Sequence, residues 1–233
     1  CFYVTALMLL PWRAIQKVAA AQVAELLRTG DMVAMNRLYK RISQINTAIG
    51  CFLLGALVIG SDTLFTFLPA EYSAGHDVIL ILGLARLIDL VTGLNGYIMV
   101  VSRYFKLDLI MNIALVVLTI GLNAWLIPKM GITGAAWATS VAMNVSNLCR
   151  MLFLWWKMGL LPLTVEMLAL GLLGSVAFLA QWAIPDLGNV FLNFGVRFTV
   201  FAVLFAIPTV HWGLVPDANR LYEMVLRKVR LRH

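Results

Sequence analysis

Long apolar runs constrain this chain more than any other feature. Segments such as 44–69 and 107–128 approach the roughly 20 residues that an α-helix needs to cross a hydrocarbon core about 30 Å thick. Only 12% of the residues are charged, against about 25% in soluble domains. In lipid the backbone must satisfy its own hydrogen bonds, which leaves helices or closed barrels, and these runs lack the alternation of barrel strands. The sequence therefore predicts an all-α membrane protein.

Proline, glycine and charge clusters divide the chain into about seven candidate transmembrane spans with short connections. Residues 1–213 are expected to form one polytopic helix bundle, and 214–233 a basic cytoplasmic tail. Between the first two spans, residues 23–43 are expected to be helical on both sides of a turn at 29–31, as a surface helix that runs into the second span. The expected spans are 1–22, 44–69, 77–101, 107–128, 131–156, 162–184 and 189–213.

Lysine and arginine in alternate connections predict the orientation, because cytoplasmic loops retain positive charge. One side carries only Lys129. We expect the other side to be cytoplasmic, together with the C-terminus, so the net charge of +7 requires no nucleic-acid partner. That side carries thirteen basic residues: Arg28, Arg37, Lys40, Arg41, Arg103, Lys106, Arg150, Lys157, Arg220, Arg227, Lys228, Arg230 and Arg232.

The sequence contains no pattern typical of a catalytic site. Its three histidines have no serine or cysteine partner at a plausible spacing, and no glycine-rich phosphate loop is present. Cys1, Cys51 and Cys149 are interpreted as packing residues, so neither a metal site nor a disulfide framework is predicted. We expect no enzyme activity and no cofactor. Positive charge follows the first apolar run instead of preceding it, which argues against a signal peptide. No initiator methionine or basic segment precedes that run, so we expect the chain to be a piece of a longer protein.

Charged residues inside the spans are the candidate functional residues, because a charge at mid-bilayer costs about 2.5–3.5 kcal/mol. Arg13 and Lys17 lie one helical turn apart and present two positive charges on one face. Either they line a substrate cavity or they extend to the cytoplasmic surface. Arg86 and Asp89 can pair within one helix, or they can line a path where Gly93 and the following Asn-Gly weaken that helix.

Arg197 has no acidic residue within four positions, so it requires a partner on another helix, a lipid headgroup or a substrate phosphate. Asp62, Asp108 and Glu166 are expected near span ends. Small residues in the segment 131–142 predict a close helix pair, since lipid offers no hydrophobic drive for association. The small residues assigned to this packing are Gly131, Gly134, Ala135 and Ala138.

Three motifs are distinctive: Glu71-Tyr72, the Gly-Leu-Asn-Gly of 93–96, and the Ile-Pro-x-x-Gly-Ile-x-Gly-Ala-Ala-x-Ala-Thr of 127–139. With these motifs the chain resembles polysaccharide-biosynthesis flippases of the multidrug/oligosaccharidyl-lipid/polysaccharide exporter superfamily. The similarity extends over residues 1–165. The resemblance implies that this chain is the C-terminal portion of a 12- to 14-helix transporter, with the N-terminal half of the same protein as its partner.

The resemblance further implies a bacterial inner-membrane flippase that moves an undecaprenyl-pyrophosphate-linked oligosaccharide outward by alternating access. Arg13, Lys17, Arg86 and Arg197 would then attract the pyrophosphate, although no family motif fixes these four positions. Two alternatives stay open. One is an exporter of lipid II or of drugs in the same superfamily; a drug exporter would be expected to have acidic residues in its cavity. The other is a membrane scaffold for polysaccharide assembly, with paired, dry charges and no cavity.

Overall fold

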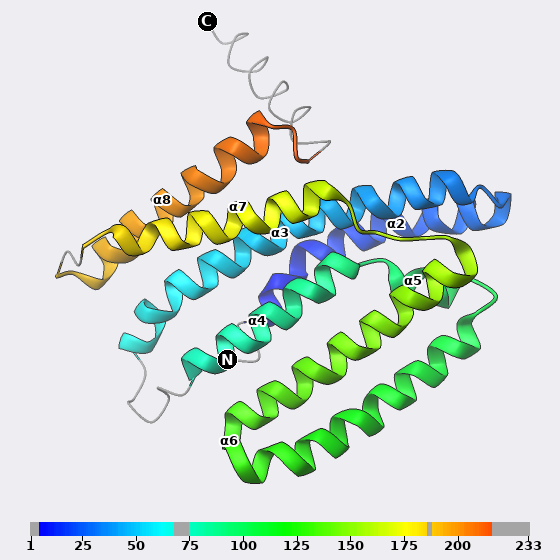
Figure 1. The fold of residues 1–233 in the computed structure, drawn as a ribbon, viewed down its shortest axis with the longest axis horizontal. Helices are drawn as coiled ribbons and strands as arrows, with labels where there is room; N and C mark the ends of the chain where they lie inside the picture. The colour runs from blue at the N-terminus through cyan, green and yellow to red at the C-terminus, as the bar shows by residue number, and fades with distance from the viewer. Residues whose placement is uncertain (1–4, 68–74, 186–187, 216–233) are drawn as a thin grey trace, which may run out of the picture.

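The computed structural model describes residues 5–67, 75–185 and 188–215, and within them the fold is entirely helical (Figure 1). This agrees with the predicted class. The helices in chain order are η1 (Leu7–Leu9), α2 (Leu10–Thr29), α3 (Met32–Thr66), α4 (Gly75–Thr92), α5 (Asn95–Val101), α6 (Phe105–Met158), α7 (Val165–Ala180), η3 (Gln181–Ala183) and α8 (Val190–His211).

Three helices are long and apolar enough to cross a membrane by length and composition: α3, α6 and α8. The seven expected spans map onto these elements unevenly. The long helix α6 contains two of them, α4 and α5 share one, and α7 is apolar but has only 16 residues. The first expected span falls on η1 and α2, and α2 is not among the three helices.

Helix ends follow local sequence signals. Gly30 terminates α2 in the left-handed conformation (φ 73°), and the side chain of Asp31 accepts a hydrogen bond from Ala34 N–H to cap α3. The predicted turn at 29–31 is thereby confirmed. The helix after this turn continues into the second expected span, as predicted, since α3 runs unbroken from Met32 to Thr66.

A sharp reversal divides α6 into two antiparallel halves (Figure 1). It occurs at Gly131, whose backbone (φ 59°, ψ −133°) is accessible essentially to glycine alone. We refer to α6 as the hairpin helix. Gly131 is exposed at the turn, so its assignment to helix packing was wrong. Gly134 does pack closely, because a Cβ there would lie 2.3 Å from the carbonyl oxygen of Leu126.

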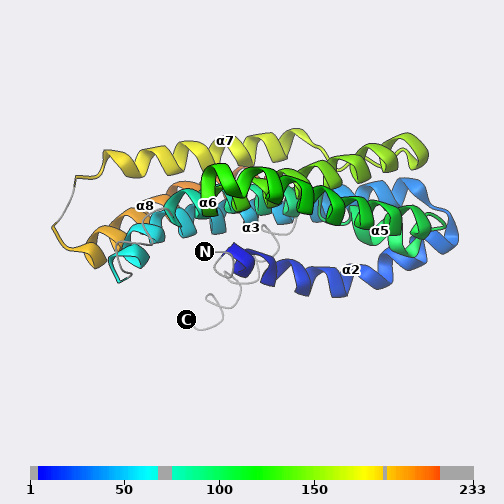
Figure 2. The same cartoon turned by 90° about the horizontal axis from the view of Figure 1, so that it is seen from below.

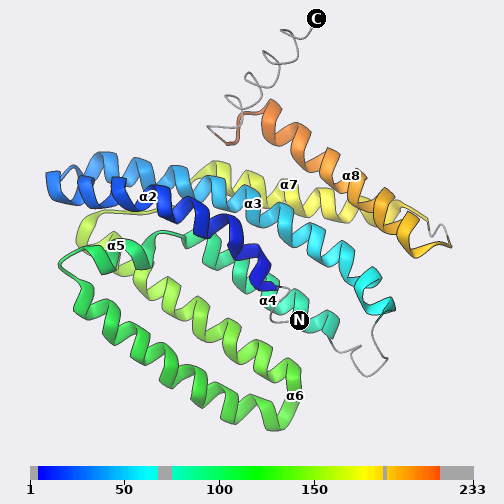
Figure 3. The same cartoon turned by 180° about the vertical axis from the view of Figure 1, so that it is seen from behind.

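The helices form a flat layer that is covered on both faces. Seen edge-on, α2 lies on one face of the α3–α4 layer and α7 lies on the other (Figure 2). The reverse view shows α2 running in front of α3 (Figure 3). One apolar cluster joins α2, α3, α5 and α6 around Tyr39, Ile98 and Leu154. A second joins α3, α7 and α8 around Phe201 and Leu170.

The connections α2–α3, α5–α6 and α6–α7 meet at one end of the layer, on the right in Figure 1. We call it the basic end, because Arg28, Arg103 and Lys157 line one pocket there. The hairpin turn, with Lys129 two residues before it, lies at the opposite end (Figure 1). Positive charge is therefore concentrated at one end of the bundle, as the count of lysine and arginine in alternate connections predicts. Residues 216–233 of the expected tail, and Glu71-Tyr72, lie outside the described residues.

The two described cysteines have different environments. Cys51 is buried in the α3–α7–α8 cluster, whereas Cys149 is exposed on α6. The interpretation as packing residues fits Cys51 and fails for Cys149. The exposed Trp155 and Trp156 lie at the end of α6, as aromatic residues at a membrane surface do.

Candidate functional site

Buried polar side chains gather where α4 breaks and the two halves of the hairpin helix approach α5. We call this group the polar layer. Each of its members is at most 8% exposed, in a bundle whose other contacts are mainly apolar. Buried polar residues inside a membrane bundle are functional candidates by default. The polar layer consists of Asn46, Thr92, Asn95, Asp108, Asn147 and Arg150.

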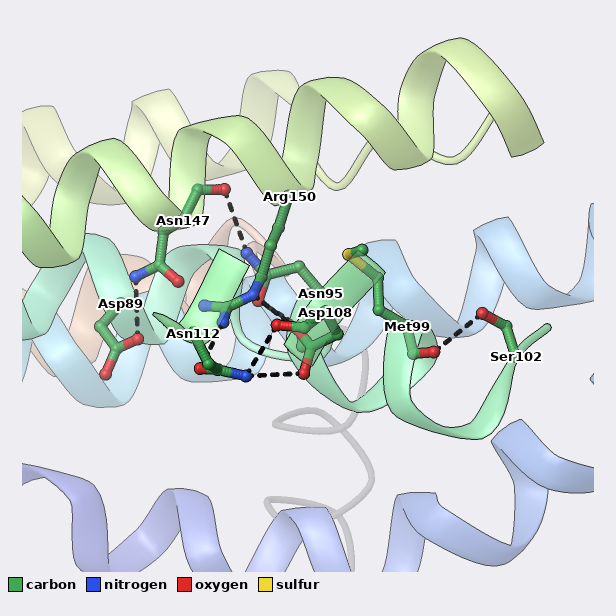
Figure 4. A network of polar contacts seen from close by, with 9 residues as sticks. Asp89, Asn95, Met99, Ser102, Asp108, Asn112, Asn147 and Arg150 are labelled. Atoms are coloured by element: carbon green, nitrogen blue, oxygen red, sulfur yellow. Dashed lines mark hydrogen bonds and ion pairs between the residues drawn. The ribbon is translucent and has the colours of Figure 1, made fainter. Parts of the chain in front are cut away.

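An ion pair anchors the polar layer between the two halves of the hairpin helix (Figure 4). Arg150 Nε donates to Asp108 Oδ1 at 2.8 Å, with side chains 10% and 7% exposed. Asn112 completes the group: its Oδ1 accepts from Arg150 Nη2 at 2.8 Å, and its Nδ2 donates to Asp108 Oδ2 at 2.9 Å. Each carboxylate oxygen of Asp108 thus accepts one hydrogen bond. From the sequence we expected Asp108 toward a span end and Arg150 on the basic side, but the sequence did not indicate that the two residues are buried and paired with each other.

A second chain of hydrogen bonds connects α4, α5 and the hairpin helix. Asn95 Nδ2 donates to the Asn147 carbonyl oxygen at 3.2 Å, and Asn147 Nδ2 donates to Asp89 Oδ1 at 2.9 Å (Figure 4). Arg86 Nη1 lies 3.7 Å from Asp89 Oδ2, so these two residues pair within α4. Both are about a quarter exposed, unlike Arg150 and Asp108.

The break between α4 and α5 occurs where the sequence predicts weakness. Helix α4 ends at Thr92, Gly93 has a positive φ of 32°, and α5 starts at Asn95. A Cβ at Gly93 would lie 2.9 Å from Asn46 Nδ2 and 3.7 Å from the Trp12 ring. Glycine is needed there for both conformation and space. The break brings α2 and α3 against the polar layer.

Polar atoms beside this layer lack a protein partner within the described part of the chain. They are buried, and leaving such an atom unpaired costs about 1–3 kcal/mol. In native proteins groups of this kind are satisfied by ordered water or by a ligand. The atoms concerned are Ser43 Oγ, Asn46 Nδ2, Asn144 Oδ1 and Ser146 Oγ.

Arg13 and Lys17 are exposed on α2 at the edge of this region. Neither makes a hydrogen bond or ion pair with the residues that the structure describes. Trp12, the residue before Arg13, packs against the apolar cluster that includes Leu94 of the α4–α5 break, so Arg13 lies close to the level of this break. At 1.5 Å per residue, Arg13 and Lys17 lie about 22 and 16 Å along α2 from Arg28 at the basic end.

The open face of α2 differs from the outer faces of α6 and α7. Its large exposed apolar residues are Leu10 and Val18, and the rest of the face is charged, polar or small. Helix α7 instead exposes an apolar stripe suited to lipid, formed by Val165, Leu168, Leu172, Val176 and Leu179. The layer therefore has one polar side and one lipid-compatible side.

Arg197 lies in a separate pocket of about 270 Å³ toward the other end of the bundle, with Ser61, His76, Asp77 and Gln181. Its Nη2 donates to the Ile184 carbonyl oxygen at 3.3 Å, while its Nε is buried without a partner in the described residues. This pocket contains none of Arg13, Lys17 and Arg86. The four cations chosen from sequence are thus not gathered into one site.

The small residues of the hairpin helix contribute to its packing. Ala138 and Ala136 are fully buried, Gly134 is buried, and Ala135 is partly exposed. Ser140, one turn further, donates to the Ile81 carbonyl oxygen at 3.3 Å. Among the described residues no group of three or more His, Cys, Asp or Glu side chains could hold a metal ion.

Comparison with known proteins found no matching family model, no matching curated protein and no matching solved structure.

Proposed function

We propose that this chain is the C-terminal portion of a bacterial inner-membrane flippase, with its C-terminus in the cytoplasm. Its substrate would be an undecaprenyl-pyrophosphate-linked oligosaccharide, made in the cytoplasm for polysaccharide biosynthesis and delivered to the outer face. The remaining helices of the transporter would cover the polar side of the layer.

The observation that carries this proposal is the pair Arg13 and Lys17 on the open, polar face of α2. The neighbouring cations Arg86 and Arg150 have carboxylate partners, and this pair has none in the described part of the chain. Their distance from the basic end falls inside the depth of a hydrocarbon core about 30 Å thick. Two unpaired positive charges at that depth require a hydrated chamber or an anionic ligand.

The polar layer supports the same interpretation. Its unpaired atoms, among them Asn46 Nδ2, favour water close to the α4–α5 break. In this proposal Arg13 and Lys17 attract the pyrophosphate from the cytoplasm, and Arg86 takes part when its contact with Asp89 at 3.7 Å opens. The break would let α4 and α5 bend during alternating access. Arg197 would act later along the path, since it lies in another pocket.

Charge sign argues against the drug-exporter alternative. A cavity that accepts organic cations needs acidic side chains, and the unpaired charges on α2 are basic. The scaffold alternative requires dry, paired charges throughout. Arg150 and Asp108 fit that description, whereas Arg13 and Lys17 do not.

The test is replacement of both cations, Arg13→Gln with Lys17→Gln, in the full-length protein in its native host. Export of surface polysaccharide should fall at least about tenfold, because charged hydrogen bonds contribute roughly 1.5–3 kcal/mol each. The matched control is Lys106→Gln with Lys129→Gln, which removes the same charge from exposed positions on α6. Immunoblotting of membranes verifies equal insertion of all variants.

Normal export by the α2 variant at wild-type membrane levels would refute the role of this pair. Loss of export in both variants would assign the effect to net charge instead. Accumulation of lipid-linked oligosaccharide on the inner leaflet distinguishes a transport defect from a defect in synthesis.

A further inference from the structure

The basic end contains a pocket that the proposed transport path does not use. Its volume is about 680 Å³, and it is formed where three connections meet. Arg28 comes from the end of α2, Arg103 from the α5–α6 connection, and Lys157 from the end of α6. Residues far apart in the sequence therefore place three positive charges around one space.

No acidic residue is among those that line this pocket in the described part of the chain. Outside the lining, Glu25 accepts a hydrogen bond from Arg28 at 2.6 Å, which lowers the pKa of the Glu25 carboxyl and compensates one charge. Arg103 and Lys157 are not compensated in this way. Arg103 lies 5.0 Å from the centre of the Tyr104 ring, and Lys157 lies 3.8 Å from that of Trp156.

Cation–π contacts orient these two side chains while leaving most of their N–H groups available. Arg103 uses one N–H, since its Nη2 donates to the Tyr104 hydroxyl at 2.8 Å. The remaining guanidinium and ammonium hydrogens can bind the oxygens of an anion. A phosphate group is the anion that Arg and Lys bind most readily in this way.

The surroundings of the pocket identify the phosphate as part of a lipid. Leu27, Val101 and Met158 form an apolar floor within the lining. Just outside it, Phe105 is 54% exposed and Trp156 is 73% exposed. Exposed aromatic residues beside basic residues are typical of a membrane surface, where headgroups meet acyl chains.

We infer that this pocket binds the headgroup of a membrane lipid whose phosphate gives it a net negative charge, with Arg103 and Lys157 as its principal ligands. Anionic glycerophospholipids and the phosphorylated isoprenoid carrier share this chemistry. The inference does not depend on the proposed transport function, because the pocket is separated from Arg13 by about 22 Å of helix α2.

The experiment counts lipids bound to the purified full-length protein by native mass spectrometry. Phosphatidylglycerol, undecaprenyl phosphate and phosphatidylcholine are added separately. Arg103→Gln with Lys157→Gln should lower the bound fraction of at least one of the first two lipids by at least about fivefold, at roughly 1 kcal/mol per basic residue. Phosphatidylcholine, which has no net charge, should bind weakly to every variant.

Two controls separate the pocket from general charge and from misfolding. Arg37→Gln with Lys106→Gln removes the same charge at exposed positions near the basic end that do not line the pocket, and it should retain binding. Ala24→Trp fills the pocket without changing charge and should lose binding, whereas Ala21→Trp, outside the lining on the same helix, should not.

Loss confined to undecaprenyl phosphate would identify the carrier as the ligand, and loss confined to phosphatidylglycerol would identify a bulk anionic lipid. Either supports the site. Equal binding by the pocket variant and wild type, or equal loss in the Arg37/Lys106 control, would overturn it.

Discussion

A buried charge in this protein is accompanied by its counter-charge and by a third polar group. Asp108 and Arg150 exemplify this, since Asn112 bonds to both of them. Removing one member of such a pair leaves the other uncompensated at low dielectric, which costs more than the pair itself contributes. The arrangement therefore makes stability sensitive to single substitutions and tolerant of paired ones.

We predict that Asp108→Asn destabilises the protein by about 3–5 kcal/mol, because Arg150 then stays buried without an anion. Thermal unfolding in detergent measures the effect. The control is Asp89→Asn, where the partner Arg86 is 24% exposed and 3.7 Å away, so less than about 1 kcal/mol should be lost. The double variant Asp108→Leu with Arg150→Met should recover most of the stability. Equal losses in both single variants would disprove the special role of Asp108.

Sequence spacing reveals local pairs and conceals distant ones. Arg86 and Asp89 are three positions apart on one helix, so their contact could be anticipated. Asp108 and Arg150 are 42 positions apart, and only the return of the hairpin helix brings them together. When each half of α6 is considered alone, Asp108 and Arg150 each lie near the charged end of an expected span. Nothing in one helical pattern specifies which neighbour will face a given side chain.

Among the elements, the hairpin helix α6 has the most demanding geometry. Its turn requires Gly131 in a conformation closed to other residues, and its halves are in close contact at Gly134. The obstacle at Gly134 is the backbone oxygen of Leu126, which cannot move aside as a flexible side chain would.

We expect Gly134→Ala to destabilise the protein by about 1–3 kcal/mol through overpacking of the hairpin. Gly121 lies in the same helix with nothing within 4 Å of its Cβ position, so Gly121→Ala should be neutral or stabilising by up to about 1 kcal/mol. Differential scanning fluorimetry of both variants compares their melting temperatures. A Gly134→Ala protein that melts no lower than Gly121→Ala would contradict the close approach.

The boundaries of elements were more predictable than their lengths. Gly30 with Asp31, and Gly93 with Asn95, are strong local signals, and the helices end there. The expected spans 107–128 and 131–156 leave two residues between them, and the chain does reverse at this point, at Gly131. Pro128, Lys129 and Gly131 are the residues that indicated the break.

At the scale of the whole molecule, the two faces of the layer differ in apolar content. Helix α2 presents a polar surface and α7 an apolar one, on opposite sides (Figure 2). No single run of residues predicts this asymmetry, because it depends on which helices are adjacent. The segregation of Arg28, Arg103 and Lys157 at one end was predictable, since it follows from alternation along the chain.

We predict that the basic end faces the cytoplasm. In a variant without Cys1, Cys51 and Cys149, a cysteine at Met130 should react with a membrane-impermeant maleimide in intact cells. A cysteine at Thr29 should react only after the membrane is permeabilised. Both parent residues are exposed, so access differs by side of the membrane and not by burial. Labelling of Thr29→Cys in intact cells would reverse the orientation.

The position of the Arg150–Asp108 pair has a consequence for biogenesis. Asp108 lies three residues after the start of α6, and Arg150 eight residues before its end. If the hairpin enters the bilayer from the translocon with its turn leading, both charges stay near the leaflet from which they entered. Within α6 only Lys129 must then traverse the hydrocarbon, at a cost of roughly 2.5–3.5 kcal/mol on insertion scales. By that route, the Arg150–Asp108 pair would form only after insertion, and neither charge would have to cross the hydrocarbon core.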